Sequence, residues 1–246
     1  MIKQIPNIIT SLNLLCGTIA LFFAISGDLI TASIFVFLGI FFDFFDGLAA
    51  RLLKAQSKVG LELDSLADMV TSGVVPGIVM VQLLYLSITG DSVDINQLFS
   101  TENWNASKYQ YLPFFGLLIT LASAYRLAKF NVDTRQTTSF IGLPTPANAL
   151  LILSIPLMLE FQYTQSLASV VLNTWLLLGV TVVSCFLLNA EIPLFSLKFK
   201  TWGFNKNLKR YFFLFISLVL IFVFKFIAIP IILLFYFILS LFWKAD

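Results

Sequence analysis

The chain has 246 residues, of which 59% are hydrophobic and 11% are charged, and its mean hydropathy is +0.94. Soluble domains carry roughly a quarter charged residues, so the composition excludes an ordinary soluble protein and predicts an all-α, multi-pass membrane bundle. The formal charge of +2 does not indicate nucleic-acid binding, and a chain without histidine has no Ser/His/Asp triad and no histidine metal site.

Eight apolar segments predict about eight transmembrane helices. They cover residues 8–26, 29–49, 66–88, 109–129, 145–162, 166–188, 211–227 and 229–244. The first segment begins with polar residues and is not followed by a small-residue cleavage site, so we expect a retained helix and not a signal peptide. The last two segments meet at a tight turn near Ala228–Pro230, and we expect a helical hairpin, with one long broken helix as the alternative.

The basic residues set the expected orientation. If both termini are cytoplasmic, every Lys and Arg except Lys108 and Lys225 falls on the inner side, as the positive-inside rule requires. The basic inner loop 189–210 then lies next to anionic lipid headgroups, and the longest outer loop covers about 89–108. We interpret residues 1–246 as one membrane-embedded domain of the cytoplasmic membrane, with a catalytic core over about 1–190 and a C-terminal hairpin over about 211–244.

Four aspartates lie in the stretch DFFDGLAARLLKAQSKVGLELDSLAD. Asp43 and Asp46 are three residues apart at the inner end of the second segment, and Asp64 and Asp68 are four apart at the start of the third. Each pair shares a helical face, so we expect all four carboxylates to converge near the inner surface. Each costs roughly 2.5–3.5 kcal/mol in apolar surroundings. Divalent cations would offset this cost, and oxygen ligands without His or Cys favour Mg²⁺ or Mn²⁺.

The residues around these aspartates are suited to a diphosphate. Gly47 and Gly60 allow a ligand or a backbone to approach closely. Arg51 can bind phosphate oxygens with both arms of its guanidinium, and Lys54 and Lys58 add positive charge at the level of the headgroups. A diphosphate bridged by metal ions favours displacement at phosphorus, because the charge of the leaving group is neutralised.

This stretch resembles the signature of the CDP-alcohol phosphotransferases. The matching pattern is Asp43-x-x-Asp46-Gly47-x-x-Ala50-Arg51, eight further residues, and Gly60-x-x-x-Asp64-x-x-x-Asp68. The resemblance implies a helical membrane core, usually dimeric, that transfers a phosphoryl-linked group from a CDP-linked donor to an alcohol and releases CMP. Over about residues 4–150, the segments IPNIITSLNLLCG, GLELDSLADMVTSGVVPG, RLAKFNV and GLPTPANA are similar to the bacterial membrane-type phosphatidylserine synthases. That likeness implies CDP-diacylglycerol and L-serine as substrates.

The resemblance also implies roles for individual residues. Asp43, Asp46, Asp64 and Asp68 would hold two Mg²⁺ or Mn²⁺ ions, and Asp64 and Asp68 would be the catalytic members, with Asp68 as the base toward the incoming alcohol. The residues expected to contact the CDP moiety are Gly47, Ala50, Arg51 and Gly60, and we expect Asn13 of the first segment to reach the same site.

The acceptor site is predicted from weaker segments. Arg126, Lys129 and Asn131 of RLAKFN are the candidates for serine binding, although ordinary positive-inside charges explain this segment equally well. GLPTPANA is expected to begin the fifth segment, and it either shapes the acceptor pocket or serves only to initiate the helix.

Two alternative functions stay open. The signature does not distinguish acceptors, so glycerol phosphate, inositol phosphate or choline could replace serine. A divalent-cation transporter could use the four carboxylates as its pathway. Against transport, the aspartates lie at the inner interface and not at the midplane, and the sequence contains no internal repeat.

Overall fold

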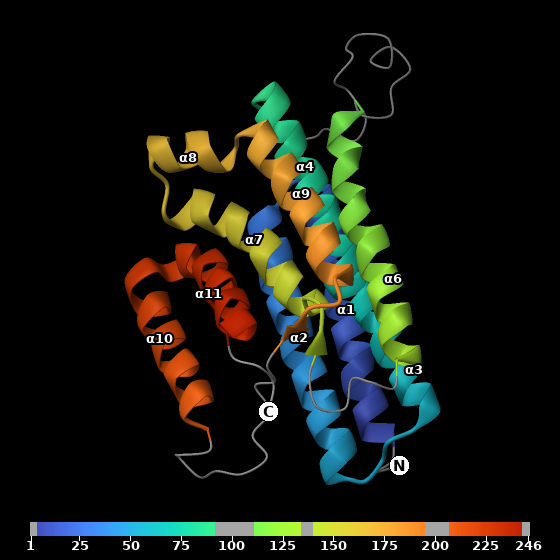
Figure 1. Cartoon of the computed structure of the whole chain (residues 1–246). Coiled ribbons are helices and arrows are strands. Elements are labelled where there is room, and N and C mark those ends of the chain that lie inside the picture. Colours follow the sequence, from blue (N-terminus) through green and yellow to red (C-terminus); the bar gives the residue numbers. More distant parts are fainter. Residues whose placement is uncertain (1–3, 92–110, 134–139, 195–206, 243–246) are drawn as a thin grey trace.

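A computed structural model describes residues 4–91, 111–133, 140–194 and 207–242, and these ranges are almost entirely helical (Figure 1). The α-helices are α1 (Ile5–Ile25), α2 (Leu29–Leu52), α3 (Lys58–Asp68), α4 (Val75–Thr89), α6 (Leu118–Val132), α7 (Thr145–Phe161), α8 (Gln165–Val171), α9 (Thr174–Asn189), α10 (Leu208–Phe224) and α11 (Ala228–Phe242). The prediction of an all-α membrane protein is confirmed. Most of the expected outer loop 89–108, Lys108 included, and the middle of the inner loop 189–210 lie outside the described residues.

Short elements of other kinds connect these helices. A π-helical segment, η2 (Met69–Val74), joins α3 to α4, and 3₁₀ turns precede α6 as η4 (Leu112–Leu117) and α11 as η5 (Lys225–Ile227). Strand β1 (Phe140–Ile141) pairs antiparallel with β2 (Pro193–Leu194), an element that the sequence did not predict. This pairing fastens the segment before α7 to the segment after α9.

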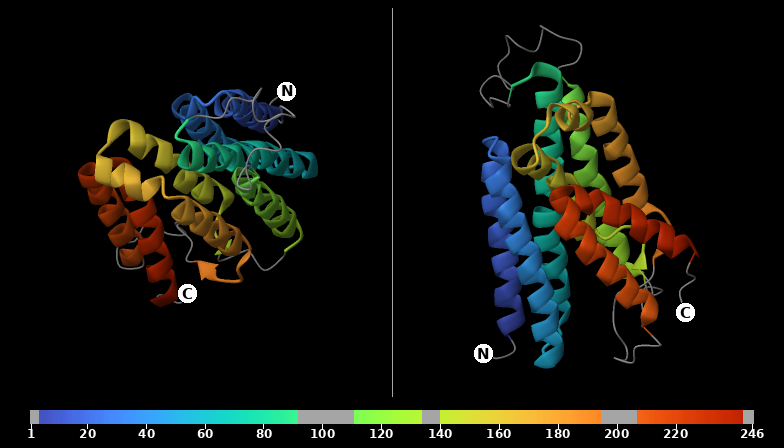
Figure 2. Two further views of the ribbon diagram at one scale, coloured as in Figure 1. Left: turned by 90° about the horizontal axis from the view of Figure 1, so that it is seen from above. Right: turned by 90° about the vertical axis from the view of Figure 1, so that its left-hand side faces the viewer.

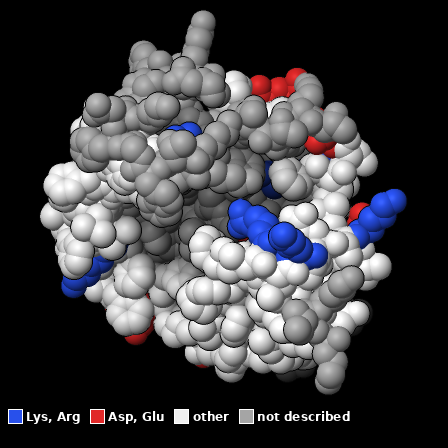
Figure 3. Space-filling view, turned by 90° about the horizontal axis from the view of Figure 1, so that it is seen from below, with Lys and Arg blue, Asp and Glu red and all other residues white. Residues whose placement is uncertain are grey.

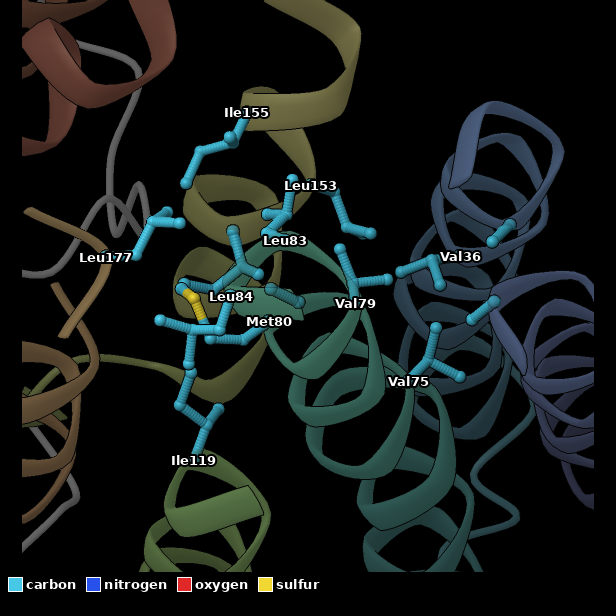
Figure 4. Close-up of a cluster of buried hydrophobic side chains, with 14 of the residues drawn as sticks. Val36, Val75, Val79, Met80, Leu83, Leu84, Ile119, Leu153, Ile155 and Leu177 are labelled. Atoms are coloured by element: carbon cyan, nitrogen blue, oxygen red, sulfur yellow. The ribbon is translucent and has the colours of Figure 1, made fainter. Parts of the chain in front are cut away.

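Helix α4 lies at the centre of the bundle. In Figure 2 it runs between the α1–α2 pair on one flank and the helices α6 and α9 on the other. Its side chains form the middle of the main hydrophobic core, which also takes residues from α2, α6, α7 and α9 (Figure 4). The residues labelled there are Val36, Val75, Val79, Met80, Leu83, Leu84, Ile119, Leu153, Ile155 and Leu177. The run from α3 to α4 is accordingly the most buried of the candidate spans.

The first three helices are longer at the site end than the sequence predicted. Helix α2 continues to Leu52, and Arg51 lies in its last turn. Helix α3 begins at Lys58, where Ser57 provides the N-cap and accepts a hydrogen bond from the Gly60 N–H at 3.0 Å. The connection between the aspartate pairs is therefore mostly helical, with a turn of only residues 53–57.

Two glycines allow the site helices to pack closely. A Cβ at Gly17 of α1 would lie 2.3 Å from Thr71 Oγ1, and a Cβ at Gly39 of α2 would lie 2.6 Å from Thr71 Cγ2. Both distances are too short for real side-chain contacts, so α1 and α2 can approach η2 only because these positions lack side chains.

The length and composition of the helices decide how many of them can cross a membrane. Four helical runs in the described residues are long and apolar enough to cross a membrane: Ile5–Ile25, Leu29–Leu52, Lys58–Thr89 and Arg210–Ser240. Helices α8 and α9, bent by 52° relative to each other, make a fifth if they form one broken span. Eight spans therefore remain a prediction, as does the cytoplasmic location of the termini.

The run Arg210–Ser240 is not one straight helix, because α10 and α11 fold back on each other as the expected hairpin (Figure 1). The chain reverses at Lys225, whose φ is +49°, and Phe213 of α10 packs on Phe235 and Tyr236 of α11. The side chain of Gln162, just after α7, accepts hydrogen bonds from the backbone N–H groups of Phe226 and Ile227. These bonds anchor the hairpin turn to the bundle.

Candidate active site

Three of the four predicted metal-binding aspartates lie together. Asp43 and Asp46 share one face of α2, and Asp64 approaches them from α3. Each offers one carboxylate oxygen, and the three oxygens all lie within 4.8 Å of one another. The predicted convergence is confirmed for these three residues, which we call the carboxylate group.

Asp68 lies at the edge of the carboxylate group. Its Oδ1 accepts a hydrogen bond from Asn13 Nδ2 at 3.3 Å, and Asn13 Oδ1 in turn accepts from Thr71 Oγ1 at 2.8 Å. Because Asn13 is completely buried, it orients Asp68 from within the bundle. Asp68 is close enough to Asp64 and Asp46 for their charges to interact, although it is not one of the three that could share an ion.

The carboxylate group fits a hard divalent cation. Asp46 Oδ2 and Asp64 Oδ1 are buried and have no hydrogen-bond partner among the described residues. In the same ranges, no Lys or Arg forms a salt bridge with any of the three carboxylates. Buried carboxylates without partners are costly, and a set of oxygen ligands alone suits Mg²⁺ or Mn²⁺.

A cleft of about 600 Å³ opens beside the carboxylate group. It is formed by the first turns of α1, the end of α2, the following turn and the start of α3. The lining residues are Pro6, Asn7, Thr10, Asp46, Gly47, Ala50, Arg51, Ala55, Gln56, Ser57, Lys58, Gly60, Leu61 and Asp64. The volume is in the range of roughly 300–1,000 Å³ that is typical of small-molecule sites. Viewed from below, basic side chains stand among mostly uncharged residues at this end (Figure 3).

The predicted nucleotide-binding residues line this cleft. Gly47, Ala50, Arg51 and Gly60 all belong to its walls, whereas Asn13 lies deeper, beside Asp68. A Cβ at Gly47 would meet nothing within 4 Å, so this glycine faces open space. Arg51 Nε donates to the Gly47 carbonyl at 2.9 Å, which holds the guanidinium near the cleft, and Arg51 forms no salt bridge within the described residues.

Sequence reasoning missed part of the lining. Asn7 and Thr10 come from α1, and Gln56 and Ser57 come from the α2–α3 turn. A signal was present in the first segment, because residues 7, 10 and 13 are all polar and recur at the spacing of one helical face. Nothing local in the sequence indicated Gln56.

Only one of the three predicted acceptor residues lies beside the carboxylates. Arg126 is buried and close enough to Asp68 for their charges to interact. Lys129 Nζ forms a salt bridge with Glu191 at 3.2 Å. The side chain of Asn131 accepts a hydrogen bond from Ser65 Oγ at 3.1 Å. Lys129 and Asn131 therefore connect neighbouring segments of the bundle, and neither is brought to the carboxylate group.

Comparisons with known proteins identify the family of this chain. The profile of the CDP-alcohol phosphatidyltransferase family matches residues 3–187, and the chain belongs to this family. A CDP-diacylglycerol–serine O-phosphatidyltransferase of Bacillus subtilis is 36% identical over 148 residues, which cover 58% of this chain and 70% of that protein. The protein of the same name from Helicobacter pylori is 32% identical over 222 residues, with 89% and 81% covered. That of Methanocaldococcus jannaschii is 29% identical over 185 residues, with 74% and 72% covered.

Proposed function

We propose that the protein transfers the phosphatidyl group of CDP-diacylglycerol to the hydroxyl of L-serine, giving phosphatidylserine and CMP. The observation that carries this proposal is the carboxylate group at the wall of a cleft of nucleotide size. The names of the relatives from Bacillus subtilis and Helicobacter pylori support serine as the acceptor. The family membership supports the CDP-linked donor.

The carboxylate group is assigned to the metal. Asp43, Asp46 and Asp64 would hold Mg²⁺ or Mn²⁺, and Asp68 at their edge would complete the set if two ions bind. A bound divalent ion neutralises charge on the diphosphate and on the departing CMP. The position of the two unpartnered carboxylate oxygens, Asp46 Oδ2 and Asp64 Oδ1, supports this assignment.

The cleft is assigned to the CDP part of the donor. Gly47 and Ala50 keep the α2 wall thin, so a nucleotide can lie against the helix backbone. Arg51 is positioned to bind phosphate oxygens, because Nε is already held by the Gly47 carbonyl and the rest of the planar group is available for charge-assisted hydrogen bonds. Lys58 adds a second positive charge to the lining.

We assign Asp68 as the base that takes the proton of the acceptor hydroxyl. A serine hydroxyl is a poor nucleophile at neutral pH, so a carboxylate that takes its proton as the new O–P bond forms contributes typically 10²–10⁴-fold in rate. Asp68 suits this role since Asn13 holds one of its oxygens and the carboxylate group lies beside it. Arg126 of α6 is close enough to Asp68 for their charges to interact, and of the three predicted acceptor-binding residues it is the one that we assign to the acceptor.

The site is expected on the cytoplasmic side of a cytoplasmic membrane, and the protein is expected to form a homodimer. The start of α1, the α2–α3 turn, the end of α6 and the start of α10 lie toward one end of the molecule (Figure 1). The segments at this end carry the basic residues that the positive-inside rule assigns to the cytoplasm. A water-soluble nucleotide product would leave from that side.

An acceptor assay tests the proposal. The purified protein is given CDP-diacylglycerol and Mn²⁺ with L-serine, glycerol 3-phosphate, inositol phosphate or choline, and lipid products and CMP are measured. Phosphatidylserine formed together with CMP in equal amounts supports the proposal. A different lipid product would show that another alcohol, and not L-serine, is the acceptor. Metal uptake into vesicles without any lipid product would indicate a transporter instead.

A further inference from the structure

The π-helical segment η2 follows directly after Asp68, and one of its side chains is bonded to a different helix. Thr71 is completely buried and lies three residues beyond Asp68. Its Oγ1 donates to Asn13 of α1, at 2.8 Å from the side-chain oxygen Oδ1 and at 3.2 Å from the backbone carbonyl. Single π-helical turns are rare and are often found at functional sites, so the role of Thr71 in the reaction needs an explanation.

Other buried hydroxyls of the bundle are satisfied within their own helices. Ser33 on α2 donates to the Leu29 carbonyl at 2.7 Å, and Thr181 on α9 donates to the Leu177 carbonyl at 2.9 Å. Both bonds run to the carbonyl four residues earlier in the same helix, which is a common partner of a buried serine or threonine. The hydroxyl of Thr71 donates instead to α1, and it therefore orients a side chain elsewhere in the bundle.

The bond from Thr71 decides which way the amide of Asn13 faces. A side-chain amide has an acceptor oxygen on one side and a donor nitrogen on the other. Because Thr71 donates to Oδ1, the Nδ2 group is directed at Asp68, whose Oδ1 accepts from it at 3.3 Å. The reversed amide would place its oxygen against an ionised carboxylate, which can only accept. These three residues form a directed series of hydrogen bonds, which we call the positioning chain.

Two glycines make room for the positioning chain. A Cβ at Gly39 of α2 would lie 2.8 Å from Asn13 Oδ1, and a Cβ at Gly17 of α1 would clash with Thr71 Oγ1. Helices α1 and α2 both pack against η2, and the α1–α2 pair runs beside the α3–α4 run in Figure 2. In this packing Asn13 and Thr71 are completely buried, so bulk water does not reach either group.

The positioning chain controls the group that takes the acceptor proton. Without the Thr71 hydroxyl, Asn13 Oδ1 would lose the donor that the described residues offer it, which is costly for a buried oxygen. An amide that turns toward another donor takes Nδ2 away from Asp68. A base must lie within roughly 2.6–3.2 Å of the atom whose proton it takes, so a small displacement of the Asp68 carboxylate slows the reaction.

We propose that Thr71 and Asn13 are positioning residues, which hold the Asp68 carboxylate in the orientation that accepts the proton of the alcohol. Asn13 engages Oδ1 of Asp68, and the other oxygen is left for the acceptor. This inference rests on the proposed function and deepens it, because it identifies how the base is held. Thr71 acts through Asn13, and Asn13 acts on the base and not on the nucleotide.

Two substitutions at one position test this proposal. Thr71→Val removes the hydroxyl and keeps the shape, whereas Thr71→Ser keeps the hydroxyl and removes the methyl group that faces Gly39. A positioned base contributes typically 10²–10⁴-fold in rate, and we expect Thr71→Val to lose part of this, lowering kcat by about 10- to 100-fold. The KM for CDP-diacylglycerol should change less than twofold. Thr71→Ser should keep kcat within about threefold of the unmodified protein.

Thr181→Val is the matched control, because it removes an equally buried hydroxyl whose bond stays within α9. It should leave kcat and both KM values unchanged. A double variant tests whether Thr71 acts through Asn13. Asn13→Leu should lower kcat by itself, and adding Thr71→Val to it should change kcat less than twofold, because the amide that Thr71 orients is already gone.

Each result supports or overturns the inference. Unchanged kcat in Thr71→Val, or an equal loss in Thr71→Val and Thr71→Ser, would show that packing and not the hydroxyl matters. Effects of Asn13→Leu and Thr71→Val that multiply would show that Thr71 acts independently of Asn13. The comparison at position 71 does not need Asn13→Leu to fold.

The proposed function is tested separately from this inference. All variants are compared with the alcohol that the unmodified protein accepts, so an acceptor other than L-serine would correct the proposed function and leave the positioning chain testable. Unmodified protein that releases CMP normally, together with unaffected Thr71→Val, would overturn the inference alone. Unmodified protein that releases no CMP with any of the alcohols would overturn the proposed function, and with it the role of Asp68 on which the inference rests.

Discussion

Replacing Gly47 by alanine should stabilise the protein and weaken binding of the donor. Gly47 lies inside α2, where alanine is more stable than glycine by about 0.5–1 kcal/mol. A Cβ would meet nothing within 4 Å, so no clash offsets this gain. For a chain of this size the melting temperature in detergent should rise by about 1–4 °C.

The same methyl group projects into the space that we assign to CDP. Crowding of a fitted ligand costs about 1–3 kcal/mol, so the KM for CDP-diacylglycerol should rise by about 5- to 150-fold, and the KM for L-serine should stay unchanged. Gly179→Ala is the control, since Gly179 lies inside α9, also meets nothing within 4 Å, and does not line the cleft. It should give the same gain in stability without an effect on the donor. An unchanged donor KM in Gly47→Ala would refute the placement of the nucleotide.

Three further predictions concern the metal, the diphosphate and a helix cap. Excess EDTA should abolish turnover, and Asp43→Asn should lose metal-dependent donor binding in a radioligand assay. Full turnover in excess EDTA would show that the reaction does not use a metal ion at this site. Arg51→Lys should raise the KM for CDP-diacylglycerol more than that for L-serine, because lysine keeps the charge but loses the planar fork. A rise in the KM for L-serine alone would contradict the assignment of Arg51 to the diphosphate. Asp28 caps α2, and hydrogen bonds from Thr31 hold its pKa below the usual range. The contribution of the ionised Asp28 to stability is therefore fully present at neutral pH and decreases as the pH falls below about 4, so Asp28→Ala should lower the melting temperature more at pH 7 than at pH 3.

Local patterns in the sequence were sufficient to predict the carboxylate group. The spacings of Asp43, Asp46 and Asp64 place them on helix faces that the short α2–α3 turn brings together. Each of the eight apolar segments likewise contains helix in the described residues, although 166–188 is divided between α8 and α9, which are bent by 52° relative to each other. The cleft walls at Gly47, Ala50, Arg51 and Gly60 were predicted through the family signature, and the structure places them together.

Long-range partners could not be predicted in the same way. Asn131 is bound by Ser65 and Lys129 by Glu191, and these pairings depend on how α6 packs against α3 and on where the chain runs after α9. The π-helical segment η2 also has no local signal, although it carries both Thr71, which binds Asn13, and Ser72. Position in the folded bundle, and not residue type, decided which basic residue faces Asp68.

The most direct test of the site is a structure of the protein with Mn²⁺ and CDP-diacylglycerol, in which the metal is located by anomalous scattering. We predict that the manganese signal lies between the carboxylates of Asp43, Asp46 and Asp64, with the diphosphate beside it and the cytidine in the cleft lined by Gly47 and Arg51. Manganese bound elsewhere, or a nucleotide outside that cleft, would contradict the assignment of this site.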